Sequence, residues 1–546
     1  MKSSTFILIS FFCLTTVDLA AQSFAPVAGE YFSRNDKSWY NRKTGITRYL
    51  IHIQEGEAEK AIQQANDHEG DVEADFVRAI AYAHLGESDK AMKFVKASLE
   101  KELPFGRYLA GDLDLLKPLR AMPDFQSMSK ELGPVLVHGP MPGAVKDREA
   151  AFWCRTDEER IVEVQVSTDK SFRKVKSGRG RTSATNGYAT TIKVDQLKPQ
   201  TRYYYRMVID DALQKELYTF STTPKMGKPS RFSVVFGGGA AYIPWQHHMW
   251  STIHAHRPDA LFLLGDNVYI DYPKRPEIQQ YCYQRRQSEP HFRNLVSHTP
   301  TYAIWDDHDF GDNDEYGTPD PNYPPWKPAV LKVFKDQWVD PGYGGAEQLP
   351  GVFFQHSIGD VDFFFLDGRY YRQPSEVGAT PSEPLSMLGT AQKQWLKEQL
   401  LQSTATFKVI ISPVPWSFDA KPAMEGRIDT WGGYREERKE IFDFLADHNI
   451  GGVLLLSADR HRSDIWKIER PNSYALYEFE SSKLTNTHTH QVMPGAVYGY
   501  NKKCSFGKLI FDTITENPSV EYQIVNIDNV VVKRFTLPLS ALQNAN

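Results

Sequence analysis

Carboxylate and imidazole side chains stand directly after short apolar segments in the C-terminal half of the sequence. The groups of this kind that could do chemistry together are Asp266, Asp306, Asp307, His308, Asp309, Asp367, Asp459 and His461. Carboxylates that converge without a cation repel one another and resist ionisation, whereas a pair of hard metal ions neutralises them. The pattern therefore indicates a site for hard metal ions.

The elements that must position these groups are strands of an α/β sheet. An apolar run followed at once by a polar or Gly-rich break recurs over residues 232–239, 260–267, 302–309, 361–369 and 453–461. Taken singly, an Asp after a strand often caps the next helix. Because ligands of α/β sheets gather beyond the carboxyl ends of the strands, we expect the five ends to form one shared site.

Three other features of the sequence are not expected to take part in the predicted metal site. The glycine run 237–239 lacks the Lys-Ser/Thr of a phosphate-binding loop, so nucleotide binding there is not expected. His488 and His490 lie in a Thr-rich segment, for which a local metal site is one interpretation and a solvated loop is the preferred one. Asp271 falls outside the strand-end pattern, and its change to Ala is expected to be tolerated far better than that of Asp266.

The chain of 546 residues is too long for one ordinary domain, and 41% hydrophobic residues are ample for sizeable cores. The predicted fold class is multidomain α/β. We expect a signal peptide over residues 1–21, a helical segment over 45–133, an all-β sandwich over 136–226 and a catalytic α/β domain over 230–546.

The helical segment contains one recognisable hairpin. Over residues 74–100, Ala79, Tyr82 and Ala91 stand at the offsets of a tetratricopeptide hairpin. Only one good copy is visible, whereas about three repeats are needed for a stable solenoid. We therefore expect a short helical appendage packed on the rest of the chain, with a protein partner of this segment as an open alternative.

The next module has the apolar period of two that is typical of strands. Its string LKPQTRYYY at 197–205 resembles the corner of a fibronectin-type sandwich, where a Tyr hydroxyl bonds to nearby backbone. This module is predicted to be structural and to carry no chemistry.

Charge and cysteine content exclude several classes of function. The sequence has 63 basic and 68 acidic residues and a net charge of -5, so neither nucleic acid nor an anionic membrane is an expected partner. Cys154, Cys282 and Cys504 lack the spacing of a zinc site or a disulfide framework, and buried thiols are expected.

The first residues have the order of a secretory signal. Lys2 precedes the apolar run 6–14, and the small pair Ala20 and Ala21 follows. The run is shorter than the roughly 20 residues that span a membrane, and no later segment is long and apolar enough to do so. We therefore expect an exported protein, either periplasmic or extracellular.

The strand-end residues also belong to longer motifs. These are GDNVY (265–269), YAIWDDHDFG (302–311), LDGR (366–369), WGGY (431–434), DRH (459–461) and SSKLT (481–485). Together they resemble the PhoD-like alkaline phosphatases of the metallophosphoesterase superfamily, and the module from residue 138 is similar to the N-terminal domain of that family. The resemblance implies a two-sheet β-sandwich flanked by helices that hydrolyses phosphate mono- or diesters with a metal-bound hydroxide.

The resemblance also implies the metal ligands. Asp266 would bridge two ions, Tyr269 would bind one of them through its phenolate, and Asp307 would bind the other. Asp459 and His461 would complete the two coordination spheres. Calcium, iron, manganese, magnesium and zinc are all compatible with such ligands.

Three further residues take substrate roles in the same resemblance. His308 would donate a hydrogen bond to the phosphoryl or leaving oxygen rather than bind metal. Asn313 and Arg369 would contact the phosphate of the ester.

Two departures from the family keep a second function open. The family commonly places a Cys ligand after the first strand, where this chain has Gly239, and residues 410–416 lack the His that the wider superfamily carries. The alternative is a catalytically weakened binding or scaffold protein that kept the fold after losing a metal. A third interpretation, a tetratricopeptide interaction protein, depends on the single hairpin.

Overall fold

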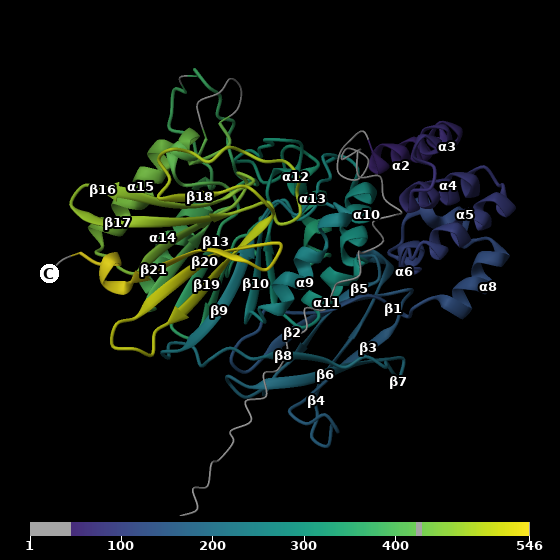
Figure 1. Cartoon of the computed structure of the whole chain (residues 1–546), viewed down its shortest axis with the longest axis horizontal. Helices are drawn as coiled ribbons and strands as arrows, with labels where there is room; N and C mark the ends of the chain where they lie inside the picture. The colour runs from purple at the N-terminus through teal and green to yellow at the C-terminus, as the bar shows by residue number, and fades with distance from the viewer. Residues whose placement is uncertain (1–44, 380, 422–427, 545–546) are drawn as a thin grey trace, which may run out of the picture.

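The computed structural model describes residues 45–379, 381–421 and 428–544. Along the chain it contains N-terminal helices, a β domain and a mixed-sheet domain, coloured from purple to yellow in Figure 1. The predicted signal peptide lies outside the described residues. Within the described residues, no helix has the length and apolar character needed to cross a membrane.

Short helices make up the N-terminal part. They are α2 (Ile46–Gln54), α3 (Ala58–Ala65), η1 (Asn66–His68), α4 (Val72–His84), α5 (Ser88–Glu100), α6 (Gly106–Leu109), η2 (Asp114–Leu116), α7 (Lys117–Arg120) and α8 (Pro123–Leu132). Asp71 caps α4 by accepting a hydrogen bond from Glu73 N at 2.9 Å. Helices α4 and α5 pair through Tyr82 and Phe94, whose stacked rings are 5.6 Å apart.

The β domain consists of two small antiparallel sheets, ordered β1-β2-β5 and β4-β3-β6-β7, with β8 paired to β6. Its elements are β1 (Leu136–Gly143), β2 (Ala150–Thr156), β3 (Ile161–Ser167), β4 (Lys176–Arg181), η3 (Ala184–Asn186), β5 (Ala189–Val194), β6 (Arg202–Ile209), β7 (Ala212–Leu213) and β8 (Tyr218–Ser221). Lys198 N donates to the Tyr203 hydroxyl at 2.8 Å, which is the backbone contact expected of the Tyr corner.

Two sheets form the body of the C-terminal domain. The strands are β9 (Arg231–Gly237), β10 (Ala260–Leu264), β11 (Thr301–Ile304), β12 (Phe354–Ile358), β13 (Val361–Phe365), β14 (Phe407–Ile411), β15 (Val453–Ser457), β16 (Ser463–Arg470), β17 (Ser473–Ser481), β18 (Tyr498–Tyr500), β19 (Ser505–Asp512), β20 (Ser519–Asn526) and β21 (Val531–Pro538). The first sheet has the order β11-β10-β9-β19-β20-β21 and the second β12-β13-β14-β15-β17-β16-β18.

Helices and turns connect these strands. They are η4 (Pro244–Gln246), α9 (His248–Ala255), α10 (Pro276–Gln287), α11 (Pro290–Val296), α12 (Asp307–Phe310), α13 (Lys327–Lys335), α14 (Gly389–Gln402), η5 (Phe418–Ala420), η6 (Trp431–Gly433), α15 (Arg435–Asp447) and η7 (Leu539–Leu542). Buried leucines of α14 and α15 pack with Ile410 and Leu455, so these two helices belong to the core layer beside β14 and β15.

Aromatic side chains fill the space between the two sheets. Phe363 on β13 lies 5.0 Å from the ring of Phe262 on β10 and 5.8 Å from that of Phe511 on β19. Strands β9, β10 and β11 run parallel, as do β13, β14, β15 and β17. Parallel strands bring their carboxyl ends to one edge of a sheet, and that edge carries the residues predicted to do chemistry.

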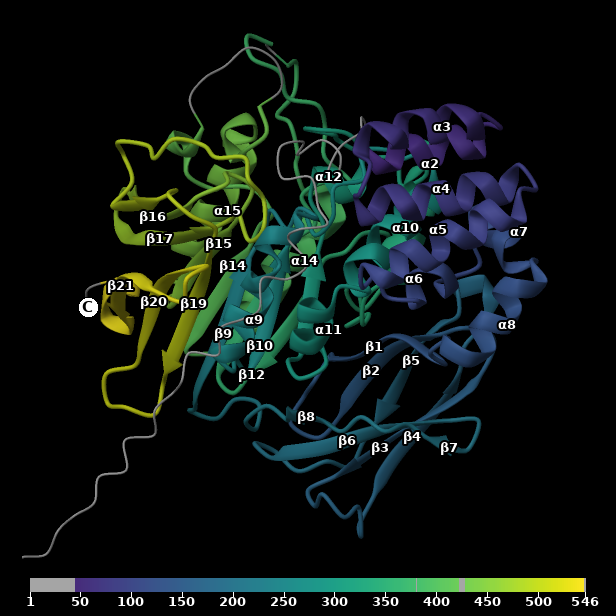
Figure 2. The ribbon, with the colours of Figure 1, turned by 45° about the vertical axis from the view of Figure 1, so that its right-hand side comes forward.

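The N-terminal helices are attached to the C-terminal domain through α10, beside which they lie in Figures 1 and 2. Buried Arg107 bonds to both carboxylate oxygens of Glu73 at 2.8 Å and to the Tyr281 hydroxyl at 3.0 Å. Glu277 accepts a hydrogen bond from Leu115 N at 2.8 Å. The helices are therefore packed on the rest of the chain through a buried polar network.

Candidate metal centre

A cavity of about 500 Å³ opens beyond the ends of β10, β11 and β15. Its lining includes Asp266, Tyr269, Asp307, His308, Asn313, Asp314, Lys421, Asp459, Arg460, His461, His488 and His490. Three of the five predicted strand ends thus line one cavity. The end of β13 does not, because buried Asp367 is used by the Trp305 indole and by Val352 N.

The loop after β10 is held by hydrogen bonds within the site. Asp266 is buried, and the Tyr269 hydroxyl donates to its Oδ2 at 2.9 Å. Asn486 Nδ2 in turn donates to the Tyr269 oxygen at 2.6 Å. The aromatic residue of the GDNVY motif is therefore oriented toward the carboxylate of the same motif.

Asp309 locks the ends of β10 and β11 together. Its carboxylate accepts hydrogen bonds from Asn267 N at 3.1 Å, from Asp306 N at 3.2 Å and from the Tyr283 hydroxyl at 3.0 Å. Burial raises the pKa of Asp309 to about 7. This carboxylate fixes the backbone that presents Asp266 and lies outside the cavity lining.

Asp266, Asp307 and His308 offer ligand atoms that all lie within 4.8 Å of one another. Asp266 Oδ1 and Asp307 Oδ1 are buried, and neither accepts a hydrogen bond from the part of the chain that the structure describes. A buried carboxylate oxygen is costly without a partner, and a cation supplies one. The donor set therefore fits a metal ion, and Asp307 with Asp314 and Asp429 forms an adjoining cluster of the same kind.

The charges of the cluster act on one another. Burial, together with the carboxylates of Asp307 and Asp459 and against the opposing effect of His308, raises the pKa of Asp266 well above its usual range. Burial also acts to raise the pKa of Asp307, but His308 and Arg369 outweigh it and hold that pKa below its usual value. A buried carboxylate that resists ionisation, as Asp266 does, is one that a bound cation would stabilise in its charged form.

Three predicted ligands adopt left-handed backbone conformations. The φ angles are +50° at Asp266, +69° at Asp459 and +48° at His461. Such angles are unfavourable for residues other than Gly and concentrate at functional sites. Asp459 and His461 lie in the cavity wall without belonging to the closest cluster, and Arg460 Nε bonds to Asp459 at 2.7 Å.

His308 is held by Asp271, which the sequence places outside the strand-end pattern. Its Nδ1 lies 2.5 Å from Asp271 Oδ1, and its ring packs 4.2 Å from that of Tyr269. Burial acts to lower the pKa of His308, but the carboxylates of Asp307, Asp266 and Asp271 raise it well above the usual value. Asp271, whose change to Ala is expected to be tolerated far better than that of Asp266, thus contacts a residue of the cavity wall.

Arg369 differs from the phosphate contact that was expected. Its side chain is fully buried and is absent from the cavity lining. Nε donates to Asp306 Oδ1 at 2.5 Å, and Nη1 and Nη2 donate to Asp429 at 2.7 and 3.0 Å. A guanidinium satisfied by two buried carboxylates is a structural ion pair beneath the site.

Other polar and charged side chains line the cavity where Arg369 does not. Asn313 lines the cavity from an exposed position, as a substrate contact would. Lys421 and Arg460 also line it and bring positive charge to its wall. Arg460 was visible as the middle residue of DRH, whereas Lys421 belongs to no motif.

The histidines of the Thr-rich segment are not simply solvated. His488 and His490 line the cavity, with ring centres 5.1 and 5.4 Å from that of His461. At Gly239, φ is +67°, and a Cβ would lie 2.9 Å from Lys483 N and 3.4 Å from His461 Nδ1. The position of the missing Cys is thus beside His461, and the chain there is shaped for Gly.

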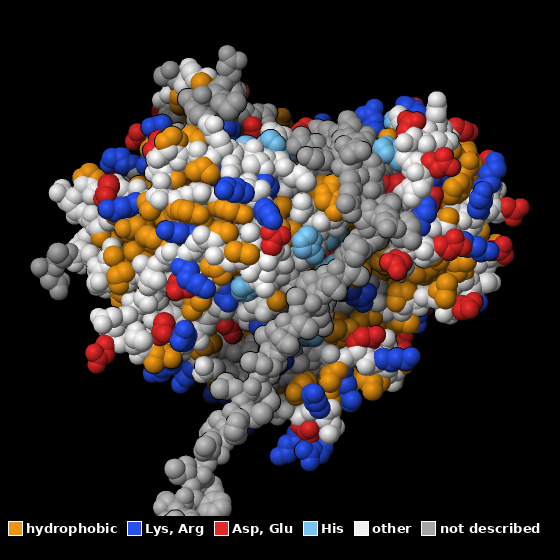
Figure 3. Space-filling view, viewed as in Figure 1, with side chains coloured by type: hydrophobic (Ala, Val, Ile, Leu, Met, Phe, Trp, Pro, Cys, Tyr) orange, Lys and Arg blue, Asp and Glu red, His pale blue; other side chains and the backbone are white. Residues whose placement is uncertain are grey.

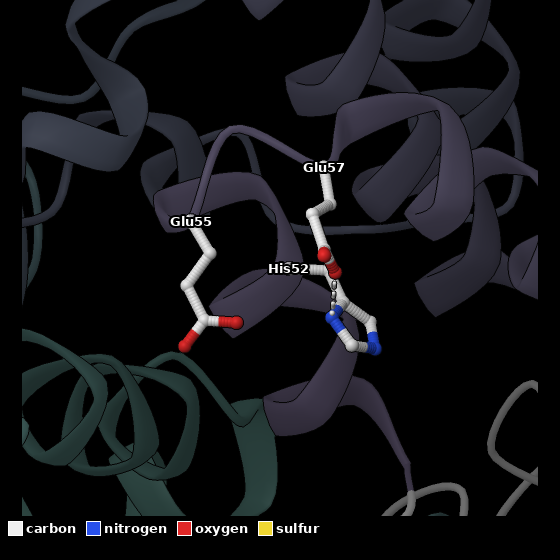
Figure 4. Close-up of side chains that lie close together, drawn as sticks. All are labelled: His52, Glu55 and Glu57. Atoms are coloured by element: carbon white, nitrogen blue, oxygen red, sulfur yellow. Dashed lines mark ion pairs between the residues drawn. The ribbon is translucent and has the colours of Figure 1, made fainter.

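A second group of ligand types lies in the N-terminal helices. His52, Glu55 and Glu57 come close together, and His52 Nδ1 is 3.0 Å from Glu57 Oε2 (Figure 4). Glu55 pairs with Arg275, and Glu57 also pairs with Lys60. Because each carboxylate has a cationic partner, these residues are explained as ion pairs.

The cysteines in the described part of the chain are not paired with one another. Cys154, Cys282 and Cys504 are buried free thiols, as predicted. On the face shown in Figure 3, Lys and Arg side chains are interspersed with Asp and Glu.

Comparison with solved structures shows the fold class. The chain is similar to the structure of PhoD, with a TM-score of 0.59 and 16% identity over 73% of this chain and 88% of that one. It is also similar to purple acid phosphatase PPD1 from yellow lupin (Lupinus luteus) seeds, with a TM-score of 0.50 and 12% identity over 74% of this chain and 75% of that one. The C-terminal domain therefore has a metallophosphatase-like fold.

Sequence comparison identifies the family. Residues 234–532 match the PhoD-like phosphatases, and residues 125–224 match the N-terminal domain of PhoD-like phosphatases. The chain belongs to the PhoD-like phosphatase family, whose members are phosphoric ester hydrolases. It is 23% identical to alkaline phosphatase D of Bacillus subtilis (strain 168) over 368 residues, which are 59% of this chain and 61% of that protein. The match thus spans less than two thirds of that relative.

Proposed function

We propose that the protein is an exported, metal-dependent phosphoesterase that hydrolyses phosphate mono- or diesters. The observation that carries the proposal is the cluster of Asp266, Asp307 and His308, with two buried carboxylate oxygens that have no hydrogen-bond donor among the described residues. A metal pair bound there would supply positive charge to the phosphoryl oxygens and activate water at neutral pH.

The chain's own residues would divide the work. Asp266 and Asp307, with Tyr269, Asp459 and His461 around them, would hold the metals. His308 can use one ring nitrogen to bond Asp271 and the other to donate to an oxygen of the reacting phosphate. The cationic side chain of Lys421 would draw an anionic ester toward the cavity, whereas Arg460 is paired with Asp459.

The direct test is hydrolysis measured together with metal content. Purified full-length protein should turn over a chromogenic phosphate monoester or diester, should lose that activity when a chelator removes the metal, and should regain it when metal is returned. Metal-loaded protein that turns over neither ester would support the alternative, a binding or scaffold protein, which the absence of the Cys ligand at Gly239 favours.

Export is supported by the pattern of the first residues alone. Lys2, the apolar run 6–14 and the pair Ala20 and Ala21 predict cleavage near residue 21 or 22. Mass spectrometry of protein from the native host should find a mature chain that begins there. A mature species that retains Met1 would rule out this cleavage.

We also propose that the N-terminal helices contain a tetratricopeptide-like hairpin, which forms a helical appendage packed on the rest of the chain. The antiparallel pair α4 and α5 supports it through the stacked Tyr82 and Phe94. A second proposal is that this hairpin binds a protein partner. An affinity capture experiment with the full chain, in which residues 45–133 stay attached to the rest, tests this proposal.

A further inference from the structure

Arg286 on α10 is a buried cation enclosed by aromatic rings. Its side chain is 1% exposed, and its Cζ lies 5.7, 5.1 and 5.8 Å from the ring centres of Tyr242, Trp250 and Phe292. Two of its three nitrogens, Nε and Nη1, are buried and have no hydrogen-bond partner among the described residues. The contacts of the third nitrogen, Nη2, are therefore the ones that fix its position.

A carboxylate influences this cation without touching it. Burial lowers the pKa of Arg286 to about 10, against the opposing charge of Glu289, so the side chain is still charged at neutral pH. The two carboxylate oxygens of Glu289 accept hydrogen bonds from His291 N at 3.1 Å and Phe292 N at 2.6 Å, at the start of α11. Burying a guanidinium without a carboxylate in contact costs free energy, and its presence here needs a reason.

The third nitrogen of Arg286 holds the turn that follows β9. Nη2 donates to the carbonyl oxygen of Ala240 at 2.5 Å and to that of Ala241 at 2.9 Å. The Thr485 hydroxyl, from the segment after β17, donates to the same Ala241 oxygen at 2.6 Å. Two separate elements are thus tied to one turn.

The same turn supports the backbone of Asp266. Ala240 N donates to the Asp266 carbonyl oxygen at 2.8 Å, and the φ angle of Asp266 is +50°. A residue other than Gly keeps such an angle only when its surroundings hold it there. Ala240 therefore links Arg286 to Asp266, because its carbonyl accepts from the guanidinium and its N–H donates to the strained residue.

The side chain of Asp266 is reached from the same place. Asn486, which follows Thr485, donates to the Tyr269 oxygen at 2.6 Å, and the Tyr269 hydroxyl donates to Asp266 Oδ2 at 2.9 Å. Both the backbone and the carboxylate of Asp266 are consequently held through contacts that meet at the turn after β9.

We propose that Arg286 is a positioning residue for the metal-binding carboxylate of Asp266 and acts through the turn of Ala240 and Ala241. This inference rests on the proposed function, because it concerns a ligand of the metal pair proposed there. The end of β9 offers Gly239 where a ligand is expected. In this chain that strand end would serve the metals by supporting the ligand of the neighbouring strand.

The test titrates metal-free, full-length protein with Mn²⁺ and measures the free ion by electron paramagnetic resonance. Arg286→Met replaces the cation with an unbranched apolar side chain. It should bind Mn²⁺ about 10–100-fold more weakly than wild type, the usual cost of removing a group that orients a metal ligand. Arg286→Lys keeps the charge but ends short of the position of Nη2, so its affinity should lie between those of Arg286→Met and wild type.

Two further measurements separate positioning from stability. Metal-free Arg286→Met protein should melt close to metal-free wild type, because removing a buried cation offsets the loss of its hydrogen bonds. Hydrogen exchange in peptides that contain Ala240 should become faster, since the bond from Ala240 N to Asp266 is loosened. A side chain that only filled space would change neither the Mn²⁺ affinity nor this exchange.

Arg155 provides the matched control. It is also 1% exposed, lies 5.6 Å from the ring centre of Trp153, and donates to the Gly187 carbonyl and to Gln337 Oε1 at 2.8 Å. None of these residues lines the metal cavity. Arg155→Met should therefore bind Mn²⁺ as wild type does, whatever it costs in stability.

The possible results separate this inference from the proposed function. Wild-type Mn²⁺ affinity in folded Arg286→Met protein, or in Arg286→Lys if the Met variant does not fold, would overturn the inference and leave the hydrolase proposal standing. Weakened Mn²⁺ binding by Arg286→Met, in a protein whose metal-loaded wild type hydrolyses no ester, would support the inference and reject the hydrolase. A wild type that binds no Mn²⁺ would remove the ion that Asp266 is inferred to hold, and with it the inference.

Discussion

Asp266→Ala protein should lose bound metal and ester hydrolysis together. Asp266 is the buried carboxylate of the closest cluster, and its Oδ1 has no hydrogen-bond donor in the described part of the chain. If Asp266 bridges the two ions, its removal leaves neither coordination sphere complete. Metal analysis and turnover of the purified variant, compared with wild type prepared alongside it, measure the two losses.

The matched control lies at the other end of the same strand. Asp259 precedes β10, is exposed, and accepts a hydrogen bond from Ser233 N at 2.8 Å. Asp259→Ala should keep the metal and the activity at a small cost in stability. Wild-type metal content in folded Asp266→Ala protein would be incompatible with the bridging assignment.

His308→Asn protein should keep its metals yet turn over about 10²–10³-fold more slowly, the usual cost of removing one donor that stabilises the developing charge. His308 lines the cavity, and Asp271 holds its Nδ1 at 2.5 Å, so the ring is oriented for one directed hydrogen bond. His461→Ala should instead lose metal affinity as well as rate. Metal stoichiometry, melting temperature and kcat of both variants distinguish the two roles.

Asp271 extends the same test. Asp271→Asn protein should keep its metals but have a lower kcat, because the amide keeps the shape of the side chain and loses the charge that orients His308. Asp271 would then act as a positioning residue. A His308 variant that melts at a lower temperature but retains full turnover per folded molecule would contradict a catalytic role for His308. His308 would then only pack against Tyr269, whose ring is 4.2 Å away.

Local pattern was sufficient to predict the elements that present the ligands. The apolar runs 260–264 and 453–457 coincide with β10 and β15, and the polar breaks after them line the cavity. These assignments succeeded because a buried parallel strand has a continuous apolar sequence and its end is marked by polar residues. Strand β4, with the sequence KSGRGR, lacks that signature and was not predicted.

The parts of the site that escaped prediction depend on long-range contacts. The loop with His488 and His490 looks like any polar turn until Asn486 meets Tyr269 and Asn501 meets the His490 carbonyl. Arg369 was assigned to the phosphate because sequence does not show that a guanidinium is enclosed by Asp306 and Asp429. In each case the missing information was which side chains the fold brings together.

The contact of Asp271 escaped prediction for a related reason. It follows the GDNVY motif by two residues and belongs to no strand end, so its sequence context gives it no task. A left-handed φ of +59° turns it toward His308, and sequence does not indicate such a turn at an Asp. The contact of Asp271 with His308 therefore depends on a backbone turn that its sequence context does not reveal.

The pairing of β9 with β19 has a consequence for how the chain acquires its fold. These strands lie side by side, with Phe236 opposite Gly507, although one opens the C-terminal domain and the other comes near its end. During synthesis β9 is made long before β19, its partner on one side. Until β19 is made, that side of β9 is an unpaired apolar edge in what will become the middle of the sheet. Closing so long a loop makes folding slow and late. The protein therefore reaches its native state only after nearly all of the chain has left the ribosome. A chain truncated near its C-terminus would expose an incomplete, aggregation-prone sheet.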